Sequence, residues 1–347
     1  MLVVLGEAPG SDEERTGIPF VGQAGKTLDE LMREAGLDRR EWHVLNTFIE
    51  RPPENDLRDV RWTLNKTEYR REFGCNPPSS PPPLKKRYLR PEHHWQLAEL
   101  SERLRAIQPD LILAMGATAL WALTAQDAIT SYRGNFFLSP FGSAIATFHP
   151  AAVLYMFQNR PVLWADLVKV RKWLDGTLMP PMKRRLWFDP SFEEIETVYK
   201  SFRRRPLDLL GVDIETAPSI AQITTISFST EREGICIPFW NKDELVRERQ
   251  NYWARVEDER IAWRWVEKFS LLPNPKVCQN GLYDSQYLMD APLDIRLRNY
   301  RHDTAIMAHS YQPELQKALG FLSSIFLNEP SWKQMRQSAK DVNKADE

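Results

Sequence analysis

Two sets of polar residues in this sequence have types and spacing that suit chemistry. The first lies in VVLGEAPGSDEERTGIPFVGQAG, from Val3 to Gly25, which joins glycines and acids to an apolar Ile-Pro-Phe-Val cluster. The segment has no G-x-G-x-x-G spacing, and its acids would repel a pyrophosphate, so the patterns of phosphate-binding glycine loops are not met. It predicts either a plain structural loop or a shallow pocket for a neutral, polar, planar ligand. Such a pocket would combine backbone amides, a carboxylate and the Phe20 ring.

The second set consists of carboxylates in the last third of the chain. Asp213 and Glu215 stand two apart in LLGVDIETA, which reads as a strand, so both carboxylates lie on one face. Two acids on one face favour a bound cation, although a solvated strand end gives the same pattern. Asn280 and Asp284 in VCQNGLYDSQYL stand four apart, which predicts one helical face, and Asp303 follows.

The elements that must position these residues alternate between strand and helix in the first half of the chain. Strands are predicted at LVVLGE, WHVLNTFIE, LILAMG and SAIATFHPAAVLY, the last turning at its His-Pro, and helices at AGKTLDELMREAGL, HHWQLAELSERLRAIQPD, ATALWALT and PVLWADLVKVRKWL. The Pro-rich, basic CNPPSSPPPLKKR is predicted to be a surface loop. This alternation predicts a parallel α/β domain.

The pattern changes after residue 176. Residues 177–206 are expected to form a linker, and residues 207–335 a second domain that opens with two adjacent strands, DLLGVDIETA and ITTISFST. Residues 336–347 form a charged tail. The expected organisation is therefore a domain over residues 1–176, a linker, a second domain and a tail.

Composition sets limits on the kind of protein. The chain has 347 residues, 42% of them hydrophobic, and a formal net charge of -1, so a nucleic-acid site would have to be a local basic groove. Its 3 cysteines, Cys75, Cys236 and Cys278, match no zinc or iron–sulfur spacing. We expect a reducing, cytoplasmic location, since neither a signal peptide nor a membrane-spanning run is found.

Three ordered motifs in the first half resemble family 4 uracil-DNA glycosylases. GEAPGSDEERTGIPFVGQAGKTLDELM is similar to the first motif of that family, LNTFIERPP to its Asn-containing strand followed by Arg-Pro-Pro, and TFHPAAVL to its terminal His-Pro-Ala motif. YRGNFF falls where the family has an Arg-Gly turn. The resemblance covers Met1 to about Leu174, and it implies a parallel-sheet α/β/α glycosylase fold.

The resemblance also implies roles for individual residues. Phe20 would stack on uracil extruded from the DNA, and the Asn46 amide would read its pairing edge, whose pattern cytosine inverts. Glu7 would crowd out a thymine methyl group, while His149 would donate a hydrogen bond to uracil O2 as negative charge develops there. Catalytic residues would be Glu7, Asn46 and His149, with Gly6, Ala8 and Phe20 completing the substrate pocket.

Each of these residues also has a plain structural interpretation. Phe20 could belong to the core, Asn46 could cap a turn, and His149 could be held extended by the following proline.

The sequence departs from the family in its cysteines. Family members usually bind an iron–sulfur cluster with four cysteines, but Glu50 stands where a cysteine would precede Arg-Pro-Pro, and Cys75 is without partners. We therefore expect no cluster, no cofactor for the glycosylase, and packing that holds the CNPPSSPPPLKKR segment. The water-activating group of the glycosylase is left open.

The second half, from about Leu209 to Lys333, resembles the 3′–5′ proofreading exonuclease domain of the DNA polymerase I family. VDIET and NGLYD match its first two motifs, and HDTAIMAHSYQPELQKALGFLSSIFL the segment after them. The resemblance implies a ribonuclease H-like α/β exonuclease fold with Mg²⁺ or Mn²⁺ bound by Asp213, Glu215 and Asp284. The third motif of the family is missing, so the exonuclease is either inactive alone or completed by another chain.

The sequence thus predicts a uracil-DNA glycosylase fused to an exonuclease-like domain. One alternative is the N-terminal proofreading part of a phage DNA polymerase whose glycosylase-like domain only senses uracil, and another is a non-enzymatic DNA-binding adaptor. The expected partners are uracil-containing DNA, single- or double-stranded, and a polymerase chain, in a bacterial or phage-infected cell and without a membrane. Lys85–Arg87, Lys183–Arg185 and Arg203–Arg205 are candidate phosphate contacts or solvated surface charge.

Overall fold

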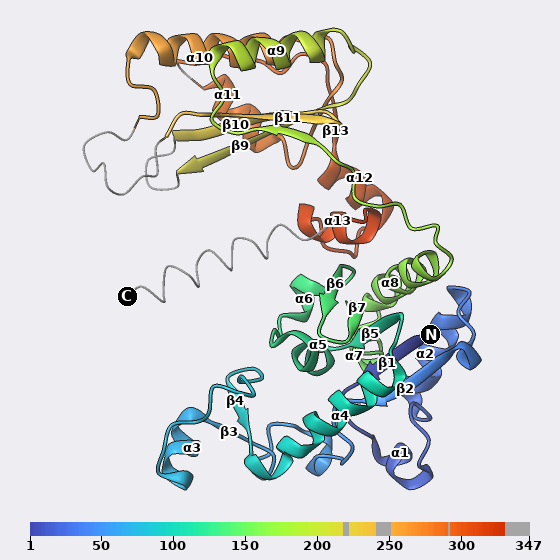
Figure 1. Ribbon diagram of the computed structural model, residues 1–347. Helices are drawn as coiled ribbons and strands as arrows, with labels where there is room; N and C mark the ends of the chain where they lie inside the picture. The colour runs from blue at the N-terminus through green and yellow to red at the C-terminus, as the bar shows by residue number, and fades with distance from the viewer. Residues whose placement is uncertain (218–221, 241–250, 291, 330–347) are drawn as a thin grey trace. The chain divides into compact units, whose positions relative to one another are not determined.

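The computed structural model describes residues 1–217, 222–240, 251–290 and 292–329. The chain divides into two compact units (Figure 1). Of the described residues, the first unit contains Met1–Pro181 and 323–329, and the second contains those between Met182 and Leu322. Each unit has its own sheet and hydrophobic core, and each is described separately.

The main sheet of the first unit has the strand order β2-β1-β5-β7-β6. Its strands are β1 (Leu2–Gly6), β2 (Trp42–Asn46), β5 (Leu111–Met115), β6 (Phe136–Ser139) and β7 (Gly142–Thr147). The first four strands in this order run parallel, which confirms the predicted parallel α/β domain. The edge strand β6 is antiparallel to β7 and was not predicted. Its four residues leave too short an alternating pattern to be told from a loop.

Helices cover both faces of this sheet because alternate residues of β1 point to opposite sides. Leu2 and Val4 belong to one hydrophobic cluster, and Val3 and Leu5 to another. The first cluster includes residues of α2 (Gln23–Glu34) and α8 (Asn159–Leu174), and the second includes residues of α4 (His94–Ile107) and α5 (Ala117–Thr124). This is the expected α/β/α arrangement.

Smaller elements connect the layers of the first unit. The short helices are α1 (Ser11–Thr16), α6 (Ile129–Tyr132) and α7 (Ala151–Tyr155). Between β2 and α4 the chain forms a lobe, residues 51–93, in which β3 (Thr63–Asn65) pairs antiparallel with β4 (Arg87–Leu89) and is followed by α3 (Lys66–Phe73). The predicted CNPPSSPPPLKKR loop lies between α3 and β4. The elements β3, α3 and β4 were not predicted from the sequence.

The second unit contains a six-stranded mixed sheet in the order β13-β12-β9-β10-β11-β8. Its strands are β8 (Arg185–Trp187), β9 (Leu210–Ala217), β10 (Gln222–Ser229), β11 (Glu233–Pro238), β12 (Lys276–Cys278) and β13 (Tyr300–Asp303). The strands β9, β10 and β11 form an antiparallel meander, and β12 and β13 continue the sheet in parallel from β9. This mixed sheet fits the predicted ribonuclease H-like α/β fold, and the predicted pairing of β9 with β10 is confirmed.

The core of the second unit lies under two long helices, α9 (Phe192–Arg203) and α10 (Val256–Ser270), which run over the sheet in Figure 1. The residues expected to be a linker, 177–206, contain β8 and α9, so part of that range is structured. The remaining helices are α11 (Leu282–Met289), α12 (Thr304–Tyr311) and α13 (Leu319–Phe326).

Residues 323–329 group with the first unit, although the predicted second domain extended to residue 335. Lys169 on α8 explains this, since its ammonium group donates to the carbonyl oxygens of Ser324 and Leu327 at 2.6 and 2.7 Å. The predicted charged tail lies outside the described residues. None of the described helices is both long and apolar enough to cross a bilayer.

Candidate active site

The candidate site of the first unit lies where its parallel strands end. Gly6 closes β1 and is in register with Asn46, the last residue of β2. Strands β5 and β7 lead to Gly116 and His149, and the Gly116 N–H donates to the carbonyl of Thr147 at 2.8 Å. The carboxyl ends of parallel strands meet at one edge of a sheet, so residues far apart in sequence converge there.

Gly6, Asn46 and Phe20 are in close contact. A Cβ atom added to Gly6 would lie 2.4 Å from Asn46 Oδ1 and 3.0 Å from Phe20 Cζ. A glycine is therefore required at this position, because any side chain would occupy the space that the amide and the ring share. Within the described part of the chain no group hydrogen-bonds the Asn46 side chain, and its Oδ1 borders this space.

Phe20 reaches the site from the connection between α1 and α2. Its backbone has a φ of 54°, a left-handed conformation that is costly for a phenylalanine. The first turn of α2 passes directly beneath it, since a Cβ added to Gly25 would lie 1.9 Å from the Phe20 carbonyl oxygen. Phe20 is 7% exposed, so the alternative interpretation of this residue as part of the core is met in part.

His149 faces the same ring. The Phe20 and His149 ring centroids are 6.0 Å apart and the two planes are inclined by 29°. Nδ1 of His149 accepts a hydrogen bond from the Ala151 N–H at 3.2 Å, which leaves the proton of a neutral imidazole on Nε2. Burial lowers the pKa of His149 below its usual value, against the opposing effect of the Glu7 and Glu13 carboxylates. The side chain is thus held as a neutral donor.

Glu7 is fixed beside the strand ends by a residue that the sequence analysis did not single out. The hydroxyl group of Thr118, in the first turn of α5, donates to the Glu7 carboxylate. Thr118 is 1% exposed. Ala8, predicted to line the substrate pocket, is partly buried and packs against the small hydrophobic cluster that contains Phe48 and Trp121.

Gly116 was also missed. Its φ of 89° is open only to glycine, and a Cβ there would lie 3.2 Å from the His149 Cβ. LILAMG followed by ATALWALT did predict a strand that passes into a helix. The glycine between them and the threonine on the helix are the only available signals, and neither reveals which distant residue it contacts.

A cavity of about 600 Å³ adjoins Asn46. It is lined by α1 and the chain after β2, including Glu13, Ile18, Arg51 and Trp62, but not by Phe20 or His149. The cavity and the Phe20–Asn46–His149 cluster therefore share Asn46 as a wall. Together they offer an aromatic face, an amide with free donor and acceptor groups, and a neutral imidazole donor. These groups suit a flat, uncharged, hydrogen-bonding ring.

The predicted metal ligands of the second unit are arranged differently. Asp213 and Glu215 are exposed on one face of β9, as the period of two predicted. Asp284 on α11 is only 3% exposed, and its carboxylate accepts a hydrogen bond from the Ile214 N–H at 2.9 Å. Burial raises the pKa of the nearby Cys278 thiol to about 12, and the charges of Asp284, Asp303 and Asp213 add to this effect.

These carboxylates do not meet as a metal site. In the described ranges no three His, Cys, Asp or Glu side chains lie close enough to hold one ion. Asn280 does not share a helical face with Asp284, because it has a φ of 58° and precedes α11. Asp303 is a structural residue, since it accepts hydrogen bonds from the Gly281 N–H at 2.8 Å and the Tyr300 hydroxyl at 2.9 Å.

Two of the candidate phosphate contacts are used inside the structure. Arg87 lies 3.3 Å from the Glu68 carboxylate, and Arg205 lies 2.8 Å from that of Glu233. Arg185 stacks on Trp187, with 4.5 Å between the guanidinium carbon and the ring centroid. These arginines therefore contribute to the fold.

Solved structures similar to this chain include exonuclease domains. The EXO domain of Aedes aegypti Nibbler covers 46% of this chain and 77% of its own, with a TM-score of 0.32 and 11% identity. An EXD2 exonuclease domain soaked in Mg covers 47% of this chain and 84% of its own, with a TM-score of 0.25 and 15% identity. At these TM-scores and identities, the structural similarity assigns no function to this chain.

Sequence comparison identifies the first half of the chain. The model of the uracil DNA glycosylase superfamily matches residues 1–168. The type-4 uracil-DNA glycosylase of Thermotoga maritima is 33% identical over 178 residues, which cover 50% of this chain and 77% of the relative. That of Archaeoglobus fulgidus is 31% identical over 178 residues, 49% of this chain and 74% of the relative. Through its N-terminal half, this chain belongs to the uracil DNA glycosylase superfamily, among relatives of type 4.

Proposed function

We propose that this protein is a uracil-DNA glycosylase, which hydrolyses the N-glycosidic bond of deoxyuridine in DNA and leaves an abasic site. The observation that carries the proposal is that Phe20 lies beside Asn46 across Gly6 and also faces the His149 ring. These residues come from three separate segments, and the family relationship covers all three. The cluster contains the aromatic, amide and donor groups that a uracil ring requires.

The pocket can discriminate among bases by hydrogen bonding and shape. An extruded uracil has left the base stack at a cost of a few kcal/mol, and stacking on Phe20 recovers part of that cost. The Asn46 amide offers one donor and one acceptor to the pairing edge, and cytosine presents the opposite pattern. Glu7, held by Thr118 at the end of β1, supplies the wall that would exclude the methyl group of thymine.

His149 would act on the leaving base. As the glycosidic bond breaks, negative charge develops on the uracil O2, and a donor placed there stabilises the transition state more than the ground state. The Ala151 N–H occupies Nδ1 of His149, so Nε2–H is the group that can donate. One such preorganised donor contributes about 3 kcal/mol to lowering the barrier.

An oligonucleotide assay tests the proposal. Purified protein is incubated in EDTA with single-stranded oligonucleotides that carry one deoxyuridine, thymidine or deoxycytidine at the same position, and the products are treated with alkali. We expect a strand break at deoxyuridine alone. No break at deoxyuridine, in single- or double-stranded DNA, would reject the proposal.

A second candidate function is metal-dependent shortening of a DNA 3′ end by the second unit. The observation that favours it is the pair of exposed carboxylates on one face of β9, with Asp284 bound to the intervening Ile214 N–H. Because the described carboxylates do not form a three-ligand site, no catalytic step is assigned to them. Laddering of a 5′-labelled strand, shortened from its 3′ end in Mn²⁺, that disappears in Asp213→Ala would support this function, and no laddering in the parent protein would reject it. A polymerase partner stays a prediction.

A further inference from the structure

The residues present do not fit an iron–sulfur cluster, although the family resemblance implies one. Such clusters are held by four cysteine thiolates, and the whole chain has 3 cysteines. Cys75 is exposed on the lobe, while Cys236 and Cys278 belong to the second unit. Glu50 stands at a position where the family has a cysteine. It takes part in a non-covalent cross-link, a hydrogen-bonded cluster that Glu50, Gln96 and His93 form.

The centre of this cross-link is Gln96 in the first turns of α4, with 0% of its surface exposed. Its Oε1 accepts hydrogen bonds from the Ile49 and Glu50 N–H groups at 2.8 and 3.0 Å. Its Nε2 donates to the Glu50 carboxylate at 3.1 Å and lies 3.4 Å from Nδ1 of His93. Both acceptor positions and both donors of the amide are therefore used, as a buried polar group requires.

His93 extends the cross-link to a third segment. Its Nε2 lies 3.1 Å from the Arg61 carbonyl, and its ring stacks on Trp62 with 3.9 Å between centroids. Trp62 in turn meets Phe48 edge to face at 5.8 Å. The chain after β2, the start of β3 and the start of α4 are thus joined at one point, which a metal cluster with ligands from several segments would also achieve.

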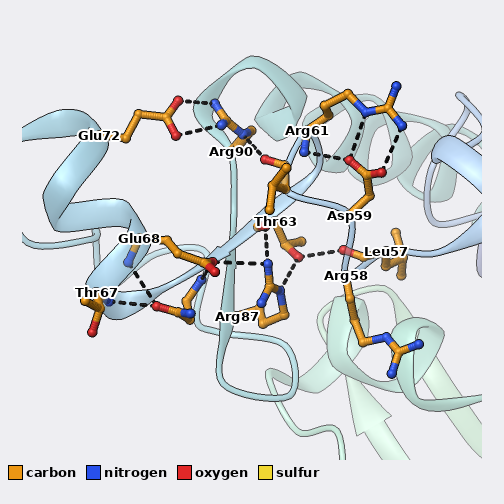
Figure 2. Close-up of polar contacts among 12 residues, drawn as sticks. Leu57, Arg58, Asp59, Arg61, Thr63, Thr67, Glu68, Glu72, Arg87 and Arg90 are labelled. Atoms are coloured by element: carbon orange, nitrogen blue, oxygen red, sulfur yellow. Dashed lines mark hydrogen bonds and ion pairs between the residues drawn. The ribbon is translucent and has the colours of Figure 1, made fainter.

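The rest of the lobe is held by polar contacts that need no metal (Figure 2). Asn65 and Glu68 form a capping box at the start of α3, and Arg87 on β4 donates to the Thr63 carbonyl at 2.7 Å. Arg90 pairs with Glu72 at 2.6 Å. Packing was expected to hold the CNPPSSPPPLKKR segment of the lobe, but these contacts were not predicted.

We propose that Gln96 is a positioning residue that, with Glu50 and His93, replaces an iron–sulfur cluster and fixes the strand end that carries Asn46. Gln96 binds the backbone three and four residues beyond Asn46, so its loss frees the segment that sets the direction of that amide. A fully satisfied buried amide holds its partners in a unique arrangement, whereas a partly satisfied one does not. The proposal rests on the proposed function, because its kinetic test requires uracil release.

The test combines metal analysis with kinetics on the full chain. We expect the purified protein to contain no stoichiometric iron or sulfide and to lack absorbance near 400 nm. Gln96→Leu should lower the melting temperature by about 3–6 °C. At a temperature where it is folded, its single-turnover rate of uracil release should fall about tenfold, while its affinity for an oligonucleotide with a tetrahydrofuran abasic analogue stays within about twofold.

Glu102→Leu, an exposed position on the same helix, is the matched control and should leave stability, rate and affinity unchanged. Stoichiometric iron, or a Gln96→Leu variant that matches the parent in both stability and rate, would overturn the proposal. A Gln96→Leu variant that loses rate and affinity in equal measure would show a general structural role and would also overturn it. An inactive parent protein would instead reject the proposed function, and the iron and melting results would still decide whether the cross-link replaces the cluster.

Discussion

His149 shows how local contacts can set the state of one side chain. The Ala151 N–H fixes its tautomer, and burial lowers its pKa, so the neutral form persists to more acidic pH than for a free imidazole. The unfolded chain takes up the proton first, so stability should also decline as the pH falls below about 6.5. The lowered pKa of His149 and the loss of stability in acid have one cause, which is that the folded state disfavours protonated His149.

The first prediction concerns the pH dependence of uracil release. We expect kcat/KM to be constant from about pH 8 down to 6.5 and to decline only at more acidic pH, since His149 stays neutral over that interval. His149→Ala should lower the rate by about 10²–10³-fold. His149→Gln, a neutral donor that does not titrate, should keep part of the activity and lose that acid decline. A decline that begins above pH 7 in the parent protein would contradict the assignment.

At the scale of elements, the site depends on where strands end and how closely the connections approach them. The strand and helix patterns predicted β1, β2, β5, β7 and the main helices, because buried strands and amphipathic helices have clear periods. Motif residues Phe20, Asn46 and His149 were predicted by resemblance. Thr118 and Gly116 were not, because their roles depend on contacts with Glu7 and His149 across the sheet.

The second prediction concerns the glycine at the end of β1. Gly6→Ala should lower the rate of uracil release by about 100-fold or more, because the new Cβ would meet Asn46 Oδ1 at 2.4 Å. A loss of this size is typical of a misplaced active-site group. The cost in stability should be about 1–3 kcal/mol, which denaturant unfolding would measure.

Gly22→Ala is the matched control for this substitution. Its Cβ would lie 3.5 Å from Glu13 Oε1, an ordinary contact, and its φ of -72° suits alanine. We expect parent activity from Gly22→Ala. Equal activity in the Gly6 and Gly22 variants would show that the space above Gly6 is not the uracil pocket.

At the scale of the whole molecule, the chain forms two compact units, each with hydrophobic clusters of its own. The sequence predicted two domains, but the range expected to be a linker contains α9, and residues 323–329, which were expected in the second domain, group with the first unit. The short β8 and the amphipathic α9 follow a Pro-rich, basic stretch, which masked their pattern. The contacts of Lys169 with Ser324 and Leu327 join segments far apart in sequence, and no local pattern indicates them.

The third prediction tests the independence of the two cores. Phe228 is fully buried in the second unit and stacks on Phe269 with 4.9 Å between centroids. Phe228→Ala should destabilise that unit by about 3–5 kcal/mol and split thermal unfolding into two transitions. Uracil release measured below the first transition should equal that of the parent protein. Loss of uracil release in step with the second unit would show that the glycosylase needs that unit to be folded.

The central claim is that Phe20, Asn46 and His149 together hold and release uracil. The most direct measurement is the single-turnover rate at which free uracil, identified by mass spectrometry, appears from a deoxyuridine oligonucleotide in EDTA. The account predicts release by the parent protein and by Asp213→Ala at the same rate, and a loss of at least about 100-fold in Asn46→Ala. Release by Asn46→Ala at the parent rate, or none by the parent protein, would contradict it.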